Sequence, residues 1–162
     1  MDNKMFCFQC EQTAGCSGCT GCAGVCGKSA DVANLQDKLT GSLIGLAGEI
    51  KNNVPSAEEK KLIIEGLFTT ITNVNFNEST IKTMIDKIHS ISGGADYDMT
   101  NIWNADEDIR SLKSLILFGI RGMAAYAYHA MVLGYEDETV DAFFVEALNC
   151  LLYTSDAADD RI

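Results

Sequence analysis

Apolar residues recur every three or four positions along much of this chain, which is the spacing that lines one face of an α-helix. The first such stripe covers residues 31–50 and ends before Pro55, the single proline of the sequence. Ser56 and Glu59 then form the pattern of a capping box, in which each side chain bonds to the other residue's backbone N–H. We therefore predict one helix over 31–50 and a second that opens after Ser56 and runs toward Val74.

Three further helices are predicted in the rest of the chain. One follows Asn77, a residue type favoured at helix N-caps, and ends at Gly93. The sequence over 95–107 is polar and irregular and indicates a boundary. A long helix over 108–133 is apolar on nearly every side, which is typical of a central position. A fifth helix is marked by the apolar residues Val140, Phe143, Phe144 and Leu148.

A weak internal repeat relates the first of these helices to the fourth. The pattern of Asp, apolar and Gly-x-Ala positions over 31–47 recurs in register over 108–124. The repeat predicts two successive three-helix bundles, the second of them incomplete. Gly45 and Gly122 occupy equivalent positions and would allow helices to approach closely. The fold class that we expect is all-α, with a cysteine-rich loop in front of the two bundles.

The end of the chain has an unusual composition. The run that starts at Cys150 looks like the translation of an adapter used to prepare sequencing libraries, so we expect native sequence to end near Asn149. The chain would then be a fragment of a longer protein. The expected units are a cysteine-rich loop (1–30), a first helical bundle (31–94), a second, truncated bundle (95–149) and a non-native tail (150–162).

The net charge of −11 argues against a nucleic-acid partner, because binding to a phosphate backbone requires clustered Lys and Arg. No apolar segment follows a basic start, so no signal peptide is predicted. The longest apolar stretch, 115–135, is interrupted by Arg121 and His129, which argues against a membrane span. We expect a cytoplasmic protein that binds neither nucleic acid nor membrane.

Six of the seven cysteines lie in one short segment, spaced by glycines and without histidine: Cys7, Cys10, Cys16, Cys19, Cys22 and Cys26. Thiolates this close repel one another unless a cation lies between them, and their softness favours zinc, iron–sulfur or copper(I). In a reducing cytoplasm they are ligands rather than disulfides. Cys7-x-x-Cys10 is the firmest element, because two intervening residues let both sulfurs reach one metal.

Spacing alone leaves the identity of the metal open. Cys7 and Cys10 with Cys16 and Cys19 would make a four-cysteine zinc site, and the chain would then be a small zinc-binding interaction module. Iron–sulfur is favoured, because the loop glycines can wrap a bulky cluster and present N–H groups to it. The ferredoxin pattern that ends in Cys-Pro is not matched, since no proline follows Cys26.

Several motifs resemble the start of the hybrid cluster proteins, also called prismane proteins or hydroxylamine reductases. The likeness is carried by Met5-Phe-Cys-Phe-Gln-Cys-Glu-Gln-Thr-Ala14, Gly18-Cys19-Thr20, Gly24-Val-Cys-Gly-Lys28 and Asn34-Leu-Gln-Asp37. A later run, 120–135, is similar to the helical domain of the same family. The resemblance covers essentially all of residues 5–149. The opening motif argues against the related carbon monoxide dehydrogenases.

In that family four N-terminal cysteines bind a conventional cluster that passes electrons. Matched motif to motif, the resemblance implies that the ligands are Cys7, Cys10, Cys19 and Cys26. The eight-residue gap between Cys10 and Cys19 is similar to that of the members with a [4Fe–4S] cluster, rather than those with [2Fe–2S]. Cys16 and Cys22 would be bystanders, although either could replace Cys19 as a ligand.

The resemblance also implies an activity for the parent protein. That protein would reduce hydroxylamine to ammonia and water, or nitric oxide, with electrons from an external donor protein. Its second centre, a hybrid iron–sulfur–oxygen cluster where substrate is reduced, is bound by residues further along that are missing here. We therefore expect this chain to be the electron-relay part of the enzyme and to be inactive alone.

Other polar and aromatic residues have simpler expected roles. His89 and His129 lie inside predicted helices and are expected to pack or to face solvent rather than bind metal. Glu11 and Lys28 flank the cysteine loop, where either could tune a cluster or dock a partner, but solvated charges are the default expectation. The aromatic residues expected to pack are Trp103, Tyr126 and Tyr128.

Overall fold

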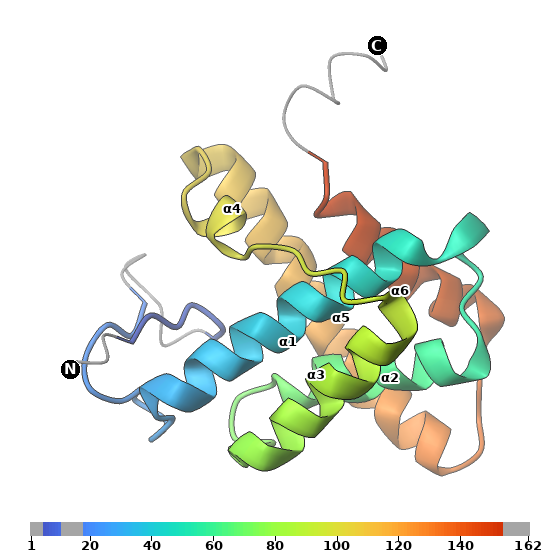
Figure 1. Cartoon of the computed structure of the whole chain (residues 1–162), viewed down its shortest axis with the longest axis horizontal. Coiled ribbons are helices and arrows are strands. Elements are labelled where there is room, and N and C mark those ends of the chain that lie inside the picture. The colour runs from blue at the N-terminus through green and yellow to red at the C-terminus, as the bar shows by residue number, and fades with distance from the viewer. Residues whose placement is uncertain (1–4, 11–17, 154–162) are drawn as a thin grey trace.

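The computed structural model of the protein describes residues 5–10 and 18–153 (Figure 1). Within these ranges the regular elements are helices, and two isolated antiparallel β-bridges pair Cys7 with Cys19 and Ala23 with Ser29. The elements are α1 (Ala30–Glu49), the 3₁₀ turn η2 (Lys51–Asn53), α2 (Ala57–Thr69), α3 (Glu78–Ser92), α4 (Thr100–Trp103), α5 (Glu107–Val132) and α6 (Glu138–Cys150). The all-α class is confirmed, and so are the five helices predicted from apolar spacing. The short α4 falls in the segment expected to be irregular.

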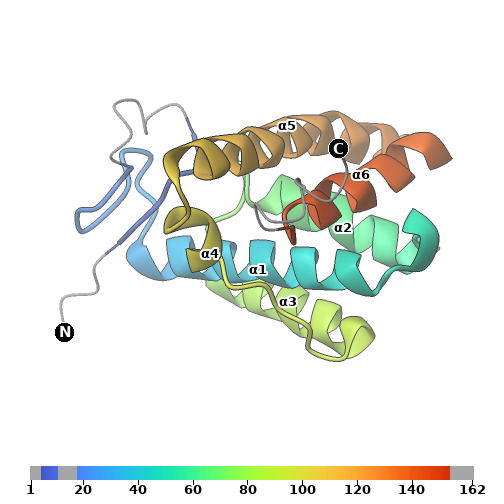
Figure 2. The ribbon, with the colours of Figure 1, turned by 90° about the horizontal axis from the view of Figure 1, so that it is seen from above.

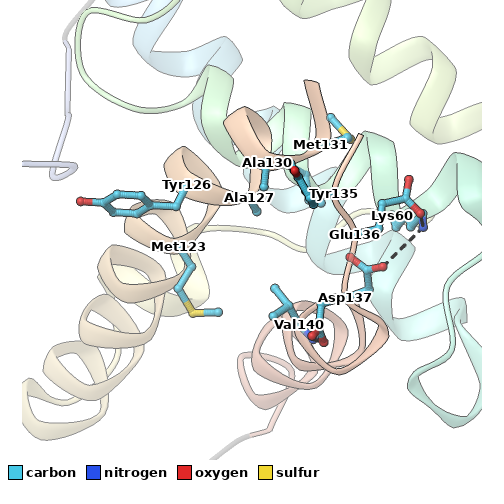
Figure 3. A pocket seen from close by; sticks show the side chains of 12 residues that line it. Lys60, Met123, Tyr126, Ala127, Ala130, Met131, Tyr135, Glu136, Asp137 and Val140 are labelled. Atoms are coloured by element: carbon cyan, nitrogen blue, oxygen red, sulfur yellow. Dashed lines mark hydrogen bonds and ion pairs between the residues drawn. The ribbon is translucent and has the colours of Figure 1, made fainter. Parts of the chain in front are cut away.

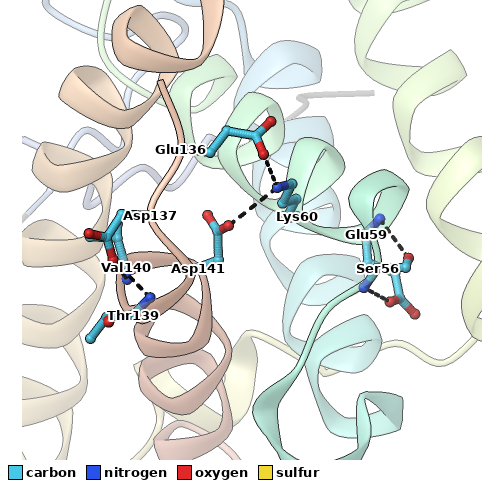
Figure 4. A network of polar contacts seen from close by, with 8 residues as sticks. All are labelled: Ser56, Glu59, Lys60, Glu136, Asp137, Thr139, Val140 and Asp141. Carbon is cyan, nitrogen blue, oxygen red and sulfur yellow. Dashed lines mark hydrogen bonds and ion pairs between the residues drawn. The ribbon is translucent and has the colours of Figure 1, made fainter. Parts of the chain in front are cut away.

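Local sequence sets the helix ends. Ser56 Oγ accepts a hydrogen bond from Glu59 N at 3.3 Å, and the Glu59 carboxylate accepts one from Ser56 N at 2.6 Å (Figure 4). This is the predicted capping box. Asn77 caps α3 through its side-chain oxygen, and Gly93 ends α3 in the left-handed region at φ 69°. α2 ends at Thr69, earlier than predicted.

α1 is the central helix of the molecule. It contacts α2, α3 and α6, and Leu39, Leu43 and Ile44 on it are fully buried. Seen from above, α3 lies along one side of α1, and α5 runs along the opposite side of the molecule (Figure 2). α5 contacts α2, α4 and α6.

The central position predicted for the helix over 108–133 is wrong. On α5, Leu115 is 68 % exposed and Tyr126 is 83 % exposed. Its buried residues are Lys113, Ser114, Leu117, Ile120, Arg121 and Ala124. The reason is that neighbouring helices cover α5 on one side only, so an all-round apolar sequence here produces one packed and one uncovered face.

One apolar core joins the two predicted bundles. Its buried members come from all six α-helices, α1 to α6, and Phe144 and Leu148 of α6 pack in the same cluster as Leu39 of α1. A smaller buried cluster of Met5, Cys7, Ala30 and Ala33 joins the cysteine-rich segment to the start of α1. The division of the helical part at residues 94 and 95 stays a prediction.

Two glycines of α1 let a loop lie directly against this helix. A Cβ atom at Gly41 would overlap the carbonyl oxygen of Tyr97, and one at Gly45 would overlap that of Ala95. The close approach of helices predicted at Gly45 is wrong, because the backbone that lies against this glycine belongs to the loop after α3. At Gly122 the prediction is wrong, because a Cβ atom there would have no described atom of another segment within 4 Å.

α5 is the one helix in the described ranges that is long and apolar enough to cross a membrane. Near its middle, the Arg121 side chain is buried: Nε donates to Thr70 Oγ1 at 2.9 Å and Nη2 donates to Thr40 Oγ1 at 3.1 Å. These bonds join α5 to α1 and to the end of α2. Length and composition alone do not distinguish a membrane span from a packed helix, and these contacts favour the packed helix.

The end of α6 is tied into the fold. Leu151 is buried in the main core, and its carbonyl oxygen accepts a hydrogen bond from Lys113 Nζ at 2.8 Å. The non-native tail expected over 150–162 stays a prediction, and residues 154–162 lie outside the described ranges.

Candidate metal centre

The cysteine-rich segment lies at the N-terminal end of α1 (Figure 2). Cys7 and Cys19 pair across an antiparallel β-bridge: Cys7 N donates to Cys19 O at 3.0 Å, and Cys19 N donates to Cys7 O at 2.9 Å. Gly18 precedes the bridge with φ at 64°, and a Cβ atom there would come within 3.0 Å of the Cys7 carbonyl oxygen. The glycine therefore allows two predicted ligands from separate parts of the segment to meet.

The cysteines differ in exposure. Cys7 is buried, whereas Cys10, Cys19 and Cys26 are half-buried. Cys22 is exposed, which is consistent with a bystander, and Cys16 lies outside the described residues. Over 5–10 and 18–153, no three His, Cys, Asp or Glu side chains converge as metal ligands. The structure thus brings Cys7 and Cys19 together, and the complete ligand set stays a prediction.

Lys28 is buried against the cysteine segment, so the expectation that its charge is solvated is wrong. The residue is 1 % exposed. Its Nζ atom donates to Cys7 Sγ at 3.7 Å and to Gln9 Oε1 at 2.8 Å. A backbone bond of 2.8 Å from Gly24 N to Lys28 O closes the turn that carries the lysine. The ammonium is thereby held inside the fold by two polar partners. Glu11 lies outside the described residues.

Gln9 links this lysine to a carboxylate on α1. Its Nε2 atom donates to Asp37 Oδ1 at 3.0 Å, while its Oε1 accepts from Lys28. Burial raises the pKa of Asp37 to about 6, against the opposing effects of the Gln9 bond and of the Arg121 and Lys28 charges. We call Lys28, Gln9 and Asp37 the Lys28 network. It runs unbroken from the sulfur of Cys7 to the first helix.

The electrostatic surroundings of Cys7 favour a partner of positive charge. Burial raises the pKa of the Cys7 thiol, while the Lys28 charge acts to lower it and Asp37 acts to raise it further. Because the effect of burial is the largest of these, the thiolate needs more positive charge than Lys28 supplies. A bound metal would supply that charge.

Sequence reasoning missed Gln9 and Asp37 as part of this site. Both lie within quoted motifs, but neither carries a metal-binding side chain that spacing would single out. One signal was available in the sequence. Asp37 follows Ala33 by one helical turn and is adjacent to Gln36, and both of those residues are buried. Polar side chains therefore lie on or beside the buried face of α1. A carboxylate beside a buried stripe requires a partner, and the loop supplies it.

An aromatic cluster fixes the other side of the cysteine segment. The ring of Trp103 lies 5.7 Å from that of Phe6 and 5.9 Å from that of Phe8, both edge to face. The rings of Phe8 and Phe118 lie 6.4 Å apart. These contacts join the segment to α4 and α5. The packing role expected for Trp103 is confirmed.

The two histidines have structural partners. His89 Nε2 lies 3.1 Å from Ser42 Oγ and 2.8 Å from Asp96 Oδ1, so it ties α3 to α1 and to the following loop. His129 packs its ring edge to face against Phe68. These hydrogen bonds and ring contacts agree with the packing role expected for the two residues.

A cavity lies toward the C-terminal end of α5, away from the aromatic cluster. It has a volume of about 390 Å³ and is formed by α2, α5, α6 and the loop before α6 (Figure 3). Tyr126 lines it and is mostly exposed, so its expected packing role is wrong, whereas Tyr128 stacks on Phe68 at 4.3 Å as expected. Lys60 and Glu136 also line the cavity, and their side chains form an ion pair (Figure 4).

A model of the Prismane/CO dehydrogenase family matches residues 5–157. The chain belongs to this family. Its membership confirms the resemblance on which the predicted ligands rest, and it implies iron–sulfur cofactors. The described cysteines agree with that donor chemistry, because Cys7 and Cys19 offer soft sulfur ligands on paired backbone segments beside a buried cation.

Similar proteins include enzymes named hydroxylamine reductase. Those of Caldanaerobacter subterraneus subsp. tengcongensis and Desulfitobacterium hafniense are 39 % and 36 % identical to this chain, each over 98 % of it. That of Clostridium perfringens is 38 % identical over 96 % of the chain. The chain spans about a third of the length of these curated relatives: 36 %, 35 % and 35 % respectively.

Proposed function

We propose that this chain is the electron-relay part of a hydroxylamine reductase and that it holds an iron–sulfur cluster. The proposed ligands are Cys7, Cys10, Cys19 and Cys26. Family membership supports the proposal, and the observation that carries it is the bridge between Cys7 and Cys19 with a buried ammonium beside the first sulfur. Thiolates of a cluster carry excess negative charge, and a desolvated cation next to one of them offsets part of it.

The proposed cofactor is a [4Fe–4S] cluster, in keeping with the eight residues between Cys10 and Cys19. When bound, such a cluster stores and releases one electron at a time, at a potential set by charge, hydrogen bonds and burial. The protein side of this task falls to the residues around Cys7. Met5, Ala30 and Ala33 pack against it and exclude water, and Lys28 donates to its sulfur.

The proposed reaction of the whole protein consumes two electrons and two protons per hydroxylamine and releases ammonia and water. Nitric oxide is a second proposed substrate. An external donor protein would supply the electrons, and the substrate would react at a hybrid iron–sulfur–oxygen cluster held by the remainder of the protein. Because the ligands must stay reduced thiolates, we place the protein in the cytoplasm.

Anaerobic purification followed by iron, sulfide and zinc analysis tests the cofactor. We expect roughly four iron and four sulfide per chain, and an EPR signal after reduction with dithionite. Changing Cys7 or Cys26 to Ser should remove most of the iron. Cys22→Ser is the matched control, because this exposed cysteine belongs to the same segment and should leave the iron content unchanged.

One zinc per chain without iron would overturn the proposal and leave a zinc-binding interaction module in its place. Substrate reduction is tested separately with a reduced dye as electron source and hydroxylamine as acceptor. The chain alone should take up electrons but should not pass them to hydroxylamine. Turnover by the chain alone would contradict the assignment of substrate reduction to the rest of the protein.

A further inference from the structure

The Lys28 network contains more than is needed to hold a cysteine in place. A lone lysine beside Cys7 would offset thiolate charge, yet the structure adds an amide and a carboxylate behind it. Lys28 and Gln9 are both buried, at 1 % and 7 % exposure, and Asp37 is half-buried. Buried polar groups are retained at a cost in desolvation free energy, so a continuous line of three beside a proposed redox site calls for an explanation.

The electrostatic interactions within the Lys28 network provide an explanation. An electron that arrives beside Cys7 adds a negative charge near the ammonium of Lys28, which already faces the Asp37 carboxylate through Gln9. In surroundings of low dielectric constant, two negative charges that share one cation disfavour one another. The carboxylate can relieve this by taking up a proton, whereas Gln9 cannot change its charge.

We propose that Asp37 binds a proton when the N-terminal cluster takes up an electron, with Gln9 and Lys28 linking its carboxylate to the sulfur of Cys7. The inference rests on the proposed function, since it requires a cluster at these cysteines. The electron comes from the external donor and the proton comes from solvent. No bond of the network breaks, because protonation at Oδ2 leaves the bond from Gln9 to Oδ1 in place.

The proton has a route to solvent. Asp37 lines a cavity of about 290 Å³ between α1 and the segment 96–103, and the exposed residues Asp98 and Thr100 line the same cavity. Gln9 and Lys28 are not among the residues that line this cavity, and they join the carboxylate to Cys7 through hydrogen bonds. Asp37 is therefore in contact both with the network that leads to the proposed redox site and with a space that exchanges protons with water.

Several charged or titratable groups surround Asp37 and bear on its protonation. They are Lys28 and Cys7 from the cysteine segment, Arg121 from α5, Lys38 from α1, and Asp96, Tyr97 and Asp98 from the loop after α3. Arg121 and Lys28 favour the carboxylate form of Asp37, and burial opposes it. Burial prevails and raises the pKa of Asp37 to about 6, so its proton equilibrium falls in the range where a nearby electron changes its occupancy at neutral pH.

Proton uptake on reduction determines the direction in which the reduction potential should change with pH. At a pH below the pKa that Asp37 has in the oxidised state, the carboxyl group is protonated in both redox states, and the reduction potential should not depend on pH. Above it, reduction is accompanied by proton uptake, so the potential should fall as pH rises, by up to about 59 mV for each tenfold drop in proton concentration. The slope should vanish again once the pH exceeds the pKa of Asp37 in the reduced state.

The test is an EPR-monitored redox titration of the cluster-loaded chain at a series of pH values from about 5 to 9, spanning the proposed proton equilibrium. Wild-type protein should show the falling segment. Asp37→Asn should show a potential that is flat over this range and higher than that of wild type at the alkaline end. Asp98→Asn is the matched control: it removes an equal charge from the same cavity, its amide oxygen can still bind Thr100 N, and it should keep the wild-type slope.

The outcomes separate the two proposals. Absence of iron from the wild-type chain would defeat the proposed function itself. A loaded cluster whose potential does not change with pH in wild type would overturn the proton coupling and leave the relay function standing. A slope that survives in Asp37→Asn would overturn the assignment to Asp37. If Asp37→Asn fails to fold, the wild-type profile and the Asp98→Asn control still decide whether coupling exists and whether it belongs to the outer carboxylate.

Discussion

The guanidinium of Arg121 is buried in the core, where it donates hydrogen bonds to two threonine hydroxyls. Its Nε atom binds Thr70 Oγ1 and its Nη2 atom binds Thr40 Oγ1, while Nη1 has no partner within the described part of the chain. Burial lowers the pKa of Arg121, and Asp37 and Cys7 act to raise it. The charge of the guanidinium thus interacts with the carboxylate of Asp37, which is also the last member of the Lys28 network.

Replacing Thr70 with Val should therefore destabilise the chain. The substitution keeps the shape of the side chain but leaves the Nε–H of Arg121 buried without an acceptor, which costs about 1–3 kcal/mol of unfolding free energy. Urea unfolding followed by circular dichroism measures this loss. Thr83→Val is the control, because its hydroxyl lies on the exposed face of α3 and bonds only to its own helix. Equal stability of the two variants would show that Thr70 does not anchor the guanidinium.

Buried charges mark the limit of what could be predicted from the sequence at this scale. The cysteines could be picked out because thiols in a cluster have few uses. Lys28 could not be assigned to the interior, since lysine is usually solvated and only the turn that begins at Gly24 brings it inward. In the sequence, Arg121 is only an interruption of an apolar stretch. Its partners lie 51 and 81 residues away, and no local pattern reports such distances.

Helix ends and helix surroundings were predictable to different degrees. The capping box at Ser56 and the left-handed glycine at Gly93 depend on residues within one turn, so the sequence indicated both. The position of α5 depends on which helices cover it, and its apolar sequence suggested a burial that the fold does not provide. The repeat likewise gave equivalent positions without equivalent neighbours.

Substitutions at Gly45 and Gly122 test this difference in neighbours between equivalent positions. Gly45→Ala would place a methyl group on the carbonyl oxygen of Ala95, a backbone atom that cannot move without shifting the loop. We expect a loss of about 1–3 kcal/mol, as for an overpacked core. Gly122→Ala meets no described atom within 4 Å and should be neutral or stabilise α5 by up to about 1 kcal/mol, because alanine is the better helix former.

Thermal unfolding of the two variants side by side checks this pair of predictions. The positions are equivalent in the repeat and both lie inside helices, so intrinsic helix propensity acts alike on them. A difference in melting temperature therefore reports the surroundings alone. If both variants were destabilised to the same extent, α5 would have a close neighbour at Gly122 that the structure does not contain.

At the scale of the whole molecule, the uncovered apolar face of α5 and the net charge of the chain have opposite effects on self-association. Leu112, Leu115 and Val132 are exposed on this helix, and Leu133 and Tyr135 continue the apolar surface beyond it. Exposed apolar surface of this kind favours association. The net charge of −11 opposes it, because like-charged molecules repel one another at low ionic strength.

The balance should shift with salt. At about 0.01 M ionic strength the screening length is about 30 Å and repulsion should keep the chain monomeric, whereas at about 1 M it is about 3 Å and the α5 face should drive self-association. Sedimentation velocity at the two salt concentrations measures this. The double variant Leu112→Glu with Leu115→Glu should remain monomeric in both. Val54→Glu, which changes an equally exposed apolar residue outside α5, adds less charge but leaves the face intact, so it should still associate at high salt. Association of the double variant at high salt would move the contact surface away from α5, because neither its charge nor its apolar area would then explain the contact.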